Sequence, residues 1–444
     1  MSRRGSRLWH LTAVLLAATL VTAACGEDEE AGPQGRREVT IGFVGAKTGD
    51  NANLGLNIRD GAKLAVDEEN QAGGDVTIRL REFDTAGDPA QASTIKGQFI
   101  DDRSIVGIVG PAFSGETKAL LPDLHQAGLV MVSASATNKD LPTVVPDQKV
   151  FHRVIGDDAL QARGVAEYID TVEKPSSVVF VHDNTEYGKG LTDDARREAQ
   201  TRGVRAAGAT RTLDPKAQDF SSVVNDIKSS GADLVFYGGY YAEAGRLKKQ
   251  LADSGVRAKF VSGDGSLDRG FIESAGASAA EGARLTCPCN LALETSQGNL
   301  KTFYDDYKQK IGREPGLYSA EAYDSAKILI KGIKAGNDTR EKLLSYVEDQ
   351  VGTYEGISKT IEFEPNGNLK ATSFFVFEVK DGKIVPLQTL TVGQQGGTTT
   401  TTGGGATTTT ARGGGTTVVT RGPTATTRAT TPTTTTPTTA GTGS

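Results

Sequence analysis

The body of the chain alternates short runs of β-branched residues with longer stretches of helical spacing. Between Glu38 and Ile272, EVTIGFVG precedes LGLNIRDGAKLAVDEEN, and SIVGIVG precedes SGETKALLPDLHQ. This order predicts a mainly parallel sheet with helices on both faces, because parallel neighbours need a crossover between them. The rhythm restarts at Pro175 with SSVVFVHD and YGKGLTDDARREAQTR. The sequence therefore predicts two similar α/β lobes.

The last third of the body has too few strands for a third lobe. It predicts helices near residues 300–311, 319–335 and 339–350, and then a strand-turn-strand region that includes FFVFEVKDGKIVPLQTL. We expect the helices to return to the first lobe and the hairpin to complete the second, so that three crossings form a hinge. The expected divisions are residues 38–157 and 290–368 for lobe 1, and residues 158–289 and 369–392 for lobe 2.

The N-terminal end is predicted to lie outside these lobes. Residues 1–24 carry three arginines, an apolar run of 14 residues and then small residues, which is typical of an export signal rather than a buried helix. The run is shorter than the roughly 20 residues of a membrane-spanning helix. The segment LVTAAC resembles a bacterial lipobox, with Thr22 where leucine is favoured. We expect Cys25 to be acylated and residues 25–37 to form an acidic tether.

The C-terminal end is dominated by threonine and glycine. Residues 393–444 contain three arginines and no acidic residue. Such a segment buries too little apolar surface to offset its ordering entropy, so we predict a disordered spacer. Thr and Pro at this density are also typical of glycosylated stalks, and the sequence leaves both alternatives open.

The charge of the body argues against nucleic acid as a partner. Three of the 49 Lys and Arg residues lie in each end and none of the 55 Asp and Glu residues does, so residues 25–392 carry a net charge near −12. A surface of this sign repels a phosphate backbone.

Two cysteines lie in the body, Cys287 and Cys289, in the triplet CPC. In an exported protein such a pair is predicted to be oxidised, as a local clamp rather than a long-range staple. The four histidines are scattered, and none stands at metal-ligand spacing from the triplet. We therefore expect neither a metal nor another cofactor.

Ligands of parallel α/β sheets bind beyond the carboxyl ends of the strands, so the segments after the strands should form the site. One of them, GPAFSGET at residues 110–117, has phosphate-loop spacing but offers Glu116 where lysine is required. The dinucleotide pattern after the first strand and a nucleophile elbow are both absent. With no histidine paired to a nucleophile, the sequence predicts a binding protein rather than an enzyme.

The GPAFSG segment suits a carboxylate better than a phosphate. Ser114 stands where a helix is predicted to begin, and there its hydroxyl and the free backbone N–H groups of the first turn converge on an anion. A plain helix-capping role for Ser114 is the alternative.

Several segments together resemble one family. REFDTAGDPAQA, SASATNKDL, VHDNTEYGKGL and FSSVVNDIKSSGADLVFYGGYYAEAG are similar to the branched-chain amino acid binding proteins of ABC importers, over residues 40–390. The resemblance implies the type I periplasmic binding fold, with two Rossmann-like lobes and a three-crossover hinge. It also implies an exported, membrane-anchored monomer that delivers an amino acid to an ABC permease.

The resemblance implies a site for the two charges of an amino acid. The ligand carboxylate falls to Ser114 and to Thr137 in the SASATN segment, which also contains Ala136. The ammonium falls to the backbone carbonyl of Ser135 and to Asp264, which stands where relatives carry glutamate.

The same resemblance implies the residues that shape the rest of the pocket. Tyr187 and Tyr240 are expected to cover the ligand from the second lobe, with ordinary packing of both rings as the alternative. Leu54 replaces a ligand-facing tyrosine, Phe113 replaces a smaller cysteine, and Tyr318 is expected to close the same pocket. Leucine, isoleucine and valine are the first candidates, and a sensor for amides, urea or aromatic acids in the same fold is the alternative.

Overall fold

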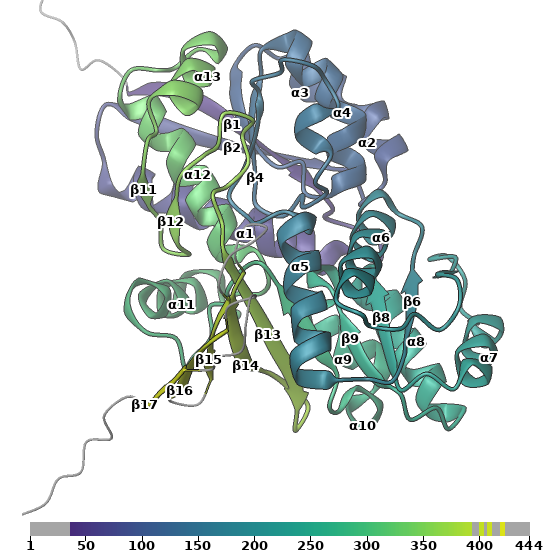
Figure 1. The fold of residues 1–444 in the computed structure, drawn as a ribbon. Coiled ribbons are helices and arrows are strands. Elements are labelled where there is room, and N and C mark those ends of the chain that lie inside the picture. Colours follow the sequence, from purple (N-terminus) through teal and green to yellow (C-terminus); the bar gives the residue numbers. More distant parts are fainter. Residues whose placement is uncertain (1–35, 393–398, 404–405, 411–417, 422–444) are drawn as a thin grey trace, which may run out of the picture. The chain divides into compact units, whose positions relative to one another are not determined.

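The computed structural model describes residues 36–392 and, for the backbone alone, residues 399–403, 406–410 and 418–421 (Figure 1). The predicted export signal and Cys25 lie outside the described residues. None of the helices among the described residues combines the length and the apolar character that crossing a membrane requires.

The first lobe is built on a five-stranded sheet in the order β2-β1-β3-β4-β5, with every pair parallel. Strands β1, β3, β4 and β5 have buried interiors because helices cover both faces of a parallel sheet, whereas the edge strand β2 is mostly half-buried or exposed. The strands are β1 Arg37–Gly45, β2 Val76–Asp84, β3 Ile105–Val109, β4 Val130–Ser133 and β5 Phe151–Arg153, and the helices between them are α1 Ala52–Ala72, α2 Pro89–Ile95, α3 Gly97–Ile100 and α4 Ser114–Ala127, with a 3-10 turn at Leu141–Thr143.

The second lobe has a parallel core that ends in an antiparallel hairpin. Its strand order runs β14-β13-β10-β9-β8-β6-β7, in which β13 and β14 are antiparallel to their neighbours. The strands are β6 Val178–His182, β7 Arg211–Thr212, β8 Leu234–Gly238, β9 Lys259–Ser262, β10 Arg284–Cys287, β13 Ser373–Lys380 and β14 Lys383–Thr391. The helices are α5 Asp158–Tyr168, continued by a π-turn at Ile169–Glu173, α6 Glu186–Thr201, α7 Ser221–Ser230, α8 Tyr241–Asp253, α9 Arg269–Ala275 and α10 Ala277–Ala280, with a 3-10 turn at Asp264–Ser266.

The remaining elements return to the first lobe. Helices α11 Gly298–Ile311 and α12 Ser319–Lys334 pack on α1, and α13 Arg340–Asp349 packs on β3, followed by the small hairpin β11 Tyr354–Glu355 and β12 Thr360–Ile361 (Figure 1). The chain therefore crosses between the lobes three times: from β5 to α5, from β10 to α11 and from β12 to β13. The predicted fold class, with two parallel α/β lobes and a triple connection, is confirmed.

The tail departs from the expectation of a disordered spacer at three segments. β15 Thr399–Gly403, β16 Ala406–Thr410 and β17 Val418–Arg421 continue the second-lobe sheet as antiparallel strands beyond β14. Threonine is β-branched and favours extended backbone, and an edge strand offers unpaired N–H and C=O groups to a neighbour. The other residues of the tail lie outside the described part.

A buried arginine fastens α13 to the first lobe. Arg340 is 2% exposed as a residue, and its guanidinium donates four hydrogen bonds of 2.8–3.1 Å to main-chain carbonyls around α3 and the start of β3. The acceptors are the carbonyls of Phe99, Ile100, Asp102 and Ile105.

We predict that Arg340→Ala lowers the free energy of unfolding by about 3 kcal/mol or more, because four buried carbonyls lose a charged donor. Denaturant unfolding followed by circular dichroism measures this loss. Lys342→Ala is the matched control, since the Lys342 side chain lies on the same helix and is 59% exposed. A loss for Arg340→Ala no larger than that of the control would contradict the assignment.

Candidate functional site

The candidate site lies at the carboxyl ends of parallel strands in both lobes, as the fold requires. In the first lobe, Phe113 is the N-cap residue of α4 and Ser114 is the first residue of that helix, which follows β3 in the chain. In the second lobe, Tyr187 lies in the first turn of α6, Tyr240 caps α8 after β8, and Asp264 begins the turn after β9.

A small pocket opens between these segments. Including its open mouth, it holds about 210 Å³ that protein atoms do not fill. Two tyrosines of the second lobe face a serine pair and two aromatic rings of the first lobe. The lining residues are Ala112, Phe113, Ser114, Ser135, Tyr187, Tyr240 and Tyr318, of which all but Ala112 belong to the predicted site.

Asp264 lies behind the pocket wall and is fully buried. Its Oδ1 accepts hydrogen bonds from the Tyr187 hydroxyl (2.6 Å) and from Nε2 of Gln161 (2.8 Å). Its Oδ2 accepts one from the hydroxyl of Tyr318, which comes from the first lobe (2.7 Å). Burial raises the pKa of Asp264, and these three donors oppose the rise. A ligand in the pocket therefore reaches the Asp264 carboxylate through the tyrosine hydroxyls.

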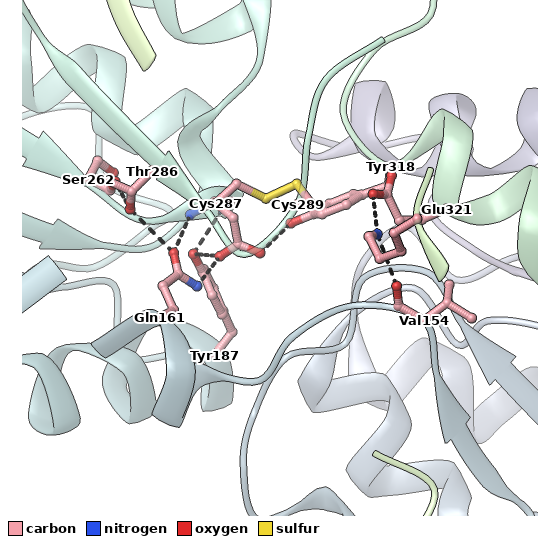
Figure 2. The surroundings of a disulfide bond; sticks show 12 residues. Val154, Gln161, Tyr187, Ser262, Thr286, Cys287, Cys289, Tyr318 and Glu321 are labelled. Atoms are coloured by element: carbon pink, nitrogen blue, oxygen red, sulfur yellow. Dashed lines mark hydrogen bonds and ion pairs between the residues drawn. A yellow bond between two sulfur atoms is a disulfide. The ribbon is translucent and has the colours of Figure 1, made fainter. Parts of the chain in front are cut away.

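The CPC triplet closes one side of this region (Figure 2). Cys287 and Cys289 form a disulfide with their Cα atoms 5.0 Å apart, where β10 leaves for the second crossing. The disulfide lies between Gln161 and Tyr187 on one side and Tyr318 on the other (Figure 2). The bond thus stiffens a hinge connection beside the Asp264 cluster.

The predicted carboxylate site is only partly assembled at the pocket surface. Oγ of Ser114 accepts the N–H of Asn138 (3.2 Å), which leaves the Ser114 hydroxyl proton available to a ligand. Thr137 and Ala136 are fully buried and do not line the pocket. Within the part of the chain that the structure describes, Oγ1 of Thr137 has no hydrogen-bond partner.

Leu54 also stays away from the pocket. It is fully buried in the first turn of α1 and packs in the core of the lobe. That turn lies directly against the strand end, since a β-carbon on Gly55 would come 1.7 Å from the carbonyl oxygen of Ala46. The leucine side chain is therefore turned into the core and not toward a ligand.

A second buried acid was missed by the sequence analysis. Asp158 is the first residue of α5, directly after the first crossing, and its N–H donates to the carbonyl of Thr137 (2.8 Å). Among the described residues neither of its carboxylate oxygens has a hydrogen-bond partner. Burial, and then the nearby charge of Asp264, hold its pKa well above the usual range. The adjacent Asp157 is the residue that caps the helix. In the sequence, the two consecutive aspartates therefore indicate only a helix cap.

Arg153, also not predicted, holds the loop after β4. Its guanidinium is fully buried, and Nη1 donates to the carbonyls of Ala136 (3.0 Å) and Asn138 (2.8 Å). These two bonds flank Thr137 and fix the loop that carries Ser135. This role of Arg153 was not predicted, because in the sequence it is simply the last residue of a strand.

Two glycines let the second-lobe tyrosines approach the cleft. A β-carbon on Gly239, where φ is +156°, would lie 2.3 Å from the Tyr237 hydroxyl oxygen. A β-carbon on Gly265 would lie 2.7 Å from the ring of Tyr187 and 3.0 Å from the ring of Tyr240. A β-carbon on Gly238 would lie 2.2 Å from Oγ1 of Thr192, so only glycine fits at any of these places, which explains the Gly-Gly pair before Tyr240.

Glu116, which spoils the phosphate-loop pattern, has a structural partner. It is fully buried in the first turn of α4, where its carboxylate accepts the N–H of Phe113 (3.2 Å) and the hydroxyl of Thr85. Burial raises the pKa of Glu116 to about 7. The described residues contain no cluster of three His, Cys, Asp or Glu side chains placed to hold a metal ion.

Comparisons with known proteins agree on one family. The model of a family described as periplasmic binding protein matches residues 38–383. Leu/Ile/Val-binding protein homolog 3 of Brucella melitensis is 32% identical over 79% of this chain and 94% of its own. The leucine-, isoleucine-, valine-, threonine-, and alanine-binding protein of Pseudomonas aeruginosa is 28% identical over 77% of this chain and 89% of its own.

A solved structure gives the same result. The branched-chain amino acid transporter substrate binding protein LivJ from Streptococcus pneumoniae, in complex with isoleucine, superposes with a TM-score of 0.72. It is 26% identical in sequence, over 78% of this chain and 98% of that one.

We predict that Glu116→Gln flattens the pH dependence of stability. The pKa of Glu116 is raised from 4.5 to about 7 in the folded protein, so its contribution to the free energy of unfolding is lost as the pH rises through that window. The loss approaches about 3 kcal/mol at 1.36 kcal/mol per pKa unit. Denaturant unfolding at pH 4.5, 6 and 8 measures it.

The exposed carboxyl of Glu273, in α9, gives the control variant Glu273→Gln. It should retain the wild-type slope of stability against pH. A Glu116→Gln protein with that same slope would show that Glu116 does not titrate in this window.

Proposed function

The chain belongs to the periplasmic binding protein family, and from this premise we propose that it is the substrate-binding component of an ABC importer for an aliphatic amino acid. The family acts outside the cytoplasmic membrane, and acylation of Cys25 would tether this member to the outer face. A membrane permease with its ATPase would be the partner. Leucine, isoleucine and valine are the first candidates through the resemblance.

The division of charge between the lobes carries the proposal. An amino acid zwitterion is costly to desolvate unless both charges are paired. The first lobe offers the start of α4, with the Ser114 hydroxyl and backbone N–H groups, to a carboxylate. The second lobe offers Asp264, reached through the Tyr187 hydroxyl, to an ammonium. The ligand that fits this arrangement best is a small molecule with one charge of each sign.

Contacts between the lobes support a closing motion driven by the ligand. On one side of the cleft, Nδ2 of Asn138 donates to the carbonyl of Glu186 and the Lys118 ammonium pairs with its carboxylate, both at 2.8 Å. On the other side, Nδ2 of Asn53 donates to Asp268 (3.0 Å). A ligand held by both lobes binds the closed form better than the open one, and that difference drives the closing motion.

A second candidate function is suggested by the lining of the pocket. Its seven residues include no charged side chain, and four of them are aromatic. Both oxygens of Asp264 already accept hydrogen bonds. A neutral amide or an aromatic acid would also suit such walls, either as a transported solute or as the signal for a receptor.

We predict that Asp264→Asn weakens amino acid binding about tenfold to a hundredfold, because a charged hydrogen bond contributes about 1.5–3 kcal/mol. Ser114→Ala should weaken it by a similar factor through the carboxylate. Isothermal titration calorimetry with amino acids, amides and benzoate measures both. Glu243→Gln is the control, since Glu243 is a buried acid of the same lobe that does not line the pocket.

Unchanged affinity of the Asp264→Asn protein would remove Asp264 from the ammonium site. Tight binding of benzoate or an amide by the wild type, with no amino acid bound, would replace the first function with the second.

A further inference from the structure

The Phe113 ring contacts the opposite lobe across the cleft. It meets Tyr240, from the opposite lobe, edge to face at 5.2 Å between centroids. Tyr240 packs on Tyr187 at the same centroid distance, with the rings tilted by 37°. The Phe113 ring therefore forms the first-lobe side of the cleft, directly opposite Tyr240.

The tyrosine walls are fixed by hydrogen bonds. The Tyr187 hydroxyl donates to Asp264 and accepts the N–H of Gly265 (2.9 Å). The Tyr318 hydroxyl donates to the other oxygen of Asp264. Rotating either ring to widen the pocket would leave a buried carboxylate oxygen short of a donor, which is unfavourable. These hydrogen bonds therefore fix the positions of the tyrosine rings and, with them, the size of the closed pocket.

Ser114 and Phe113 are adjacent in the chain, so a carboxylate bound at Ser114 places the ligand's side chain close to the Phe113 ring. Phe113 and Ser114 both line the pocket, so the Phe113 ring limits how far that side chain can extend.

Building on the proposed function, we propose that the closed pocket selects amino acids with short side chains, and that Phe113 sets the limit. Among the aliphatic amino acids, the ring favours alanine and valine over the longer side chains of leucine and isoleucine. A hydrophobic pocket discriminates by about 10- to 200-fold for one methylene. Phe113 is thus the specificity-determining residue of this site.

The test is calorimetry of wild-type protein and variants with glycine, alanine, valine, leucine and isoleucine. We expect the wild type to bind alanine or valine at least tenfold more tightly than leucine. Phe113→Ala should shift the ratio of leucine to valine affinity at least tenfold toward leucine, and Phe113→Leu should shift it less.

Phe99→Leu is the matched control, because it removes a fully buried ring from the first lobe away from the pocket. It should leave the ratio unchanged, and thermal unfolding verifies that each variant is folded. A wild type that prefers leucine, or a Phe113→Ala protein with an unchanged ratio, would overturn the size limit while amino acid binding stands. A wild type that binds no amino acid would overturn the proposed function itself.

Discussion

The cleft depends on one buried carboxylate that protein groups solvate in place of water. Asp264 accepts hydrogen bonds from Tyr187 and Gln161 of its own lobe and from Tyr318 of the other. A buried charge is costly unless it is paired or hydrogen-bonded, so these donors are held in place. Because two of them are tyrosines, their rings become the walls of the pocket. The requirement to solvate the acid thereby fixes the shape of the ligand site.

The pocket also depends on a backbone that leaves space for the tyrosine rings beside Asp264. Tyr187, Tyr240 and Asp264 follow three neighbouring parallel strands, and their segments meet at one edge of the sheet. Side chains cannot crowd this edge, which is why Gly239 and Gly265 lie beneath the rings. In the first lobe the same geometry brings Ser114 beside Ser135. Strand order and glycine placement together decide which side chains meet.

Much of the candidate site could be predicted from the sequence, and part of it could not. Five of the predicted residues line one pocket because they follow strand ends, which periodicity locates, and Tyr318 joins them from the connection between two helices. Leu54 and Thr137 lie behind the surface, since a position after a strand does not say which way a side chain turns. Asp158 and Arg153 were missed because burial gives them their importance, and burial is decided by packing between distant segments.

By itself the sequence determined the local order of strands and helices, the two-lobed α/β class and the residue types available at the strand ends. These follow from hydrophobic periodicity and turn chemistry, which act between near neighbours in the chain. Only the tertiary structure decided that Tyr318 would reach Asp264 across the lobes and that Phe113 would meet Tyr240. Such contacts join segments 54 and 127 residues apart, and their geometry is set by packing that no local pattern records.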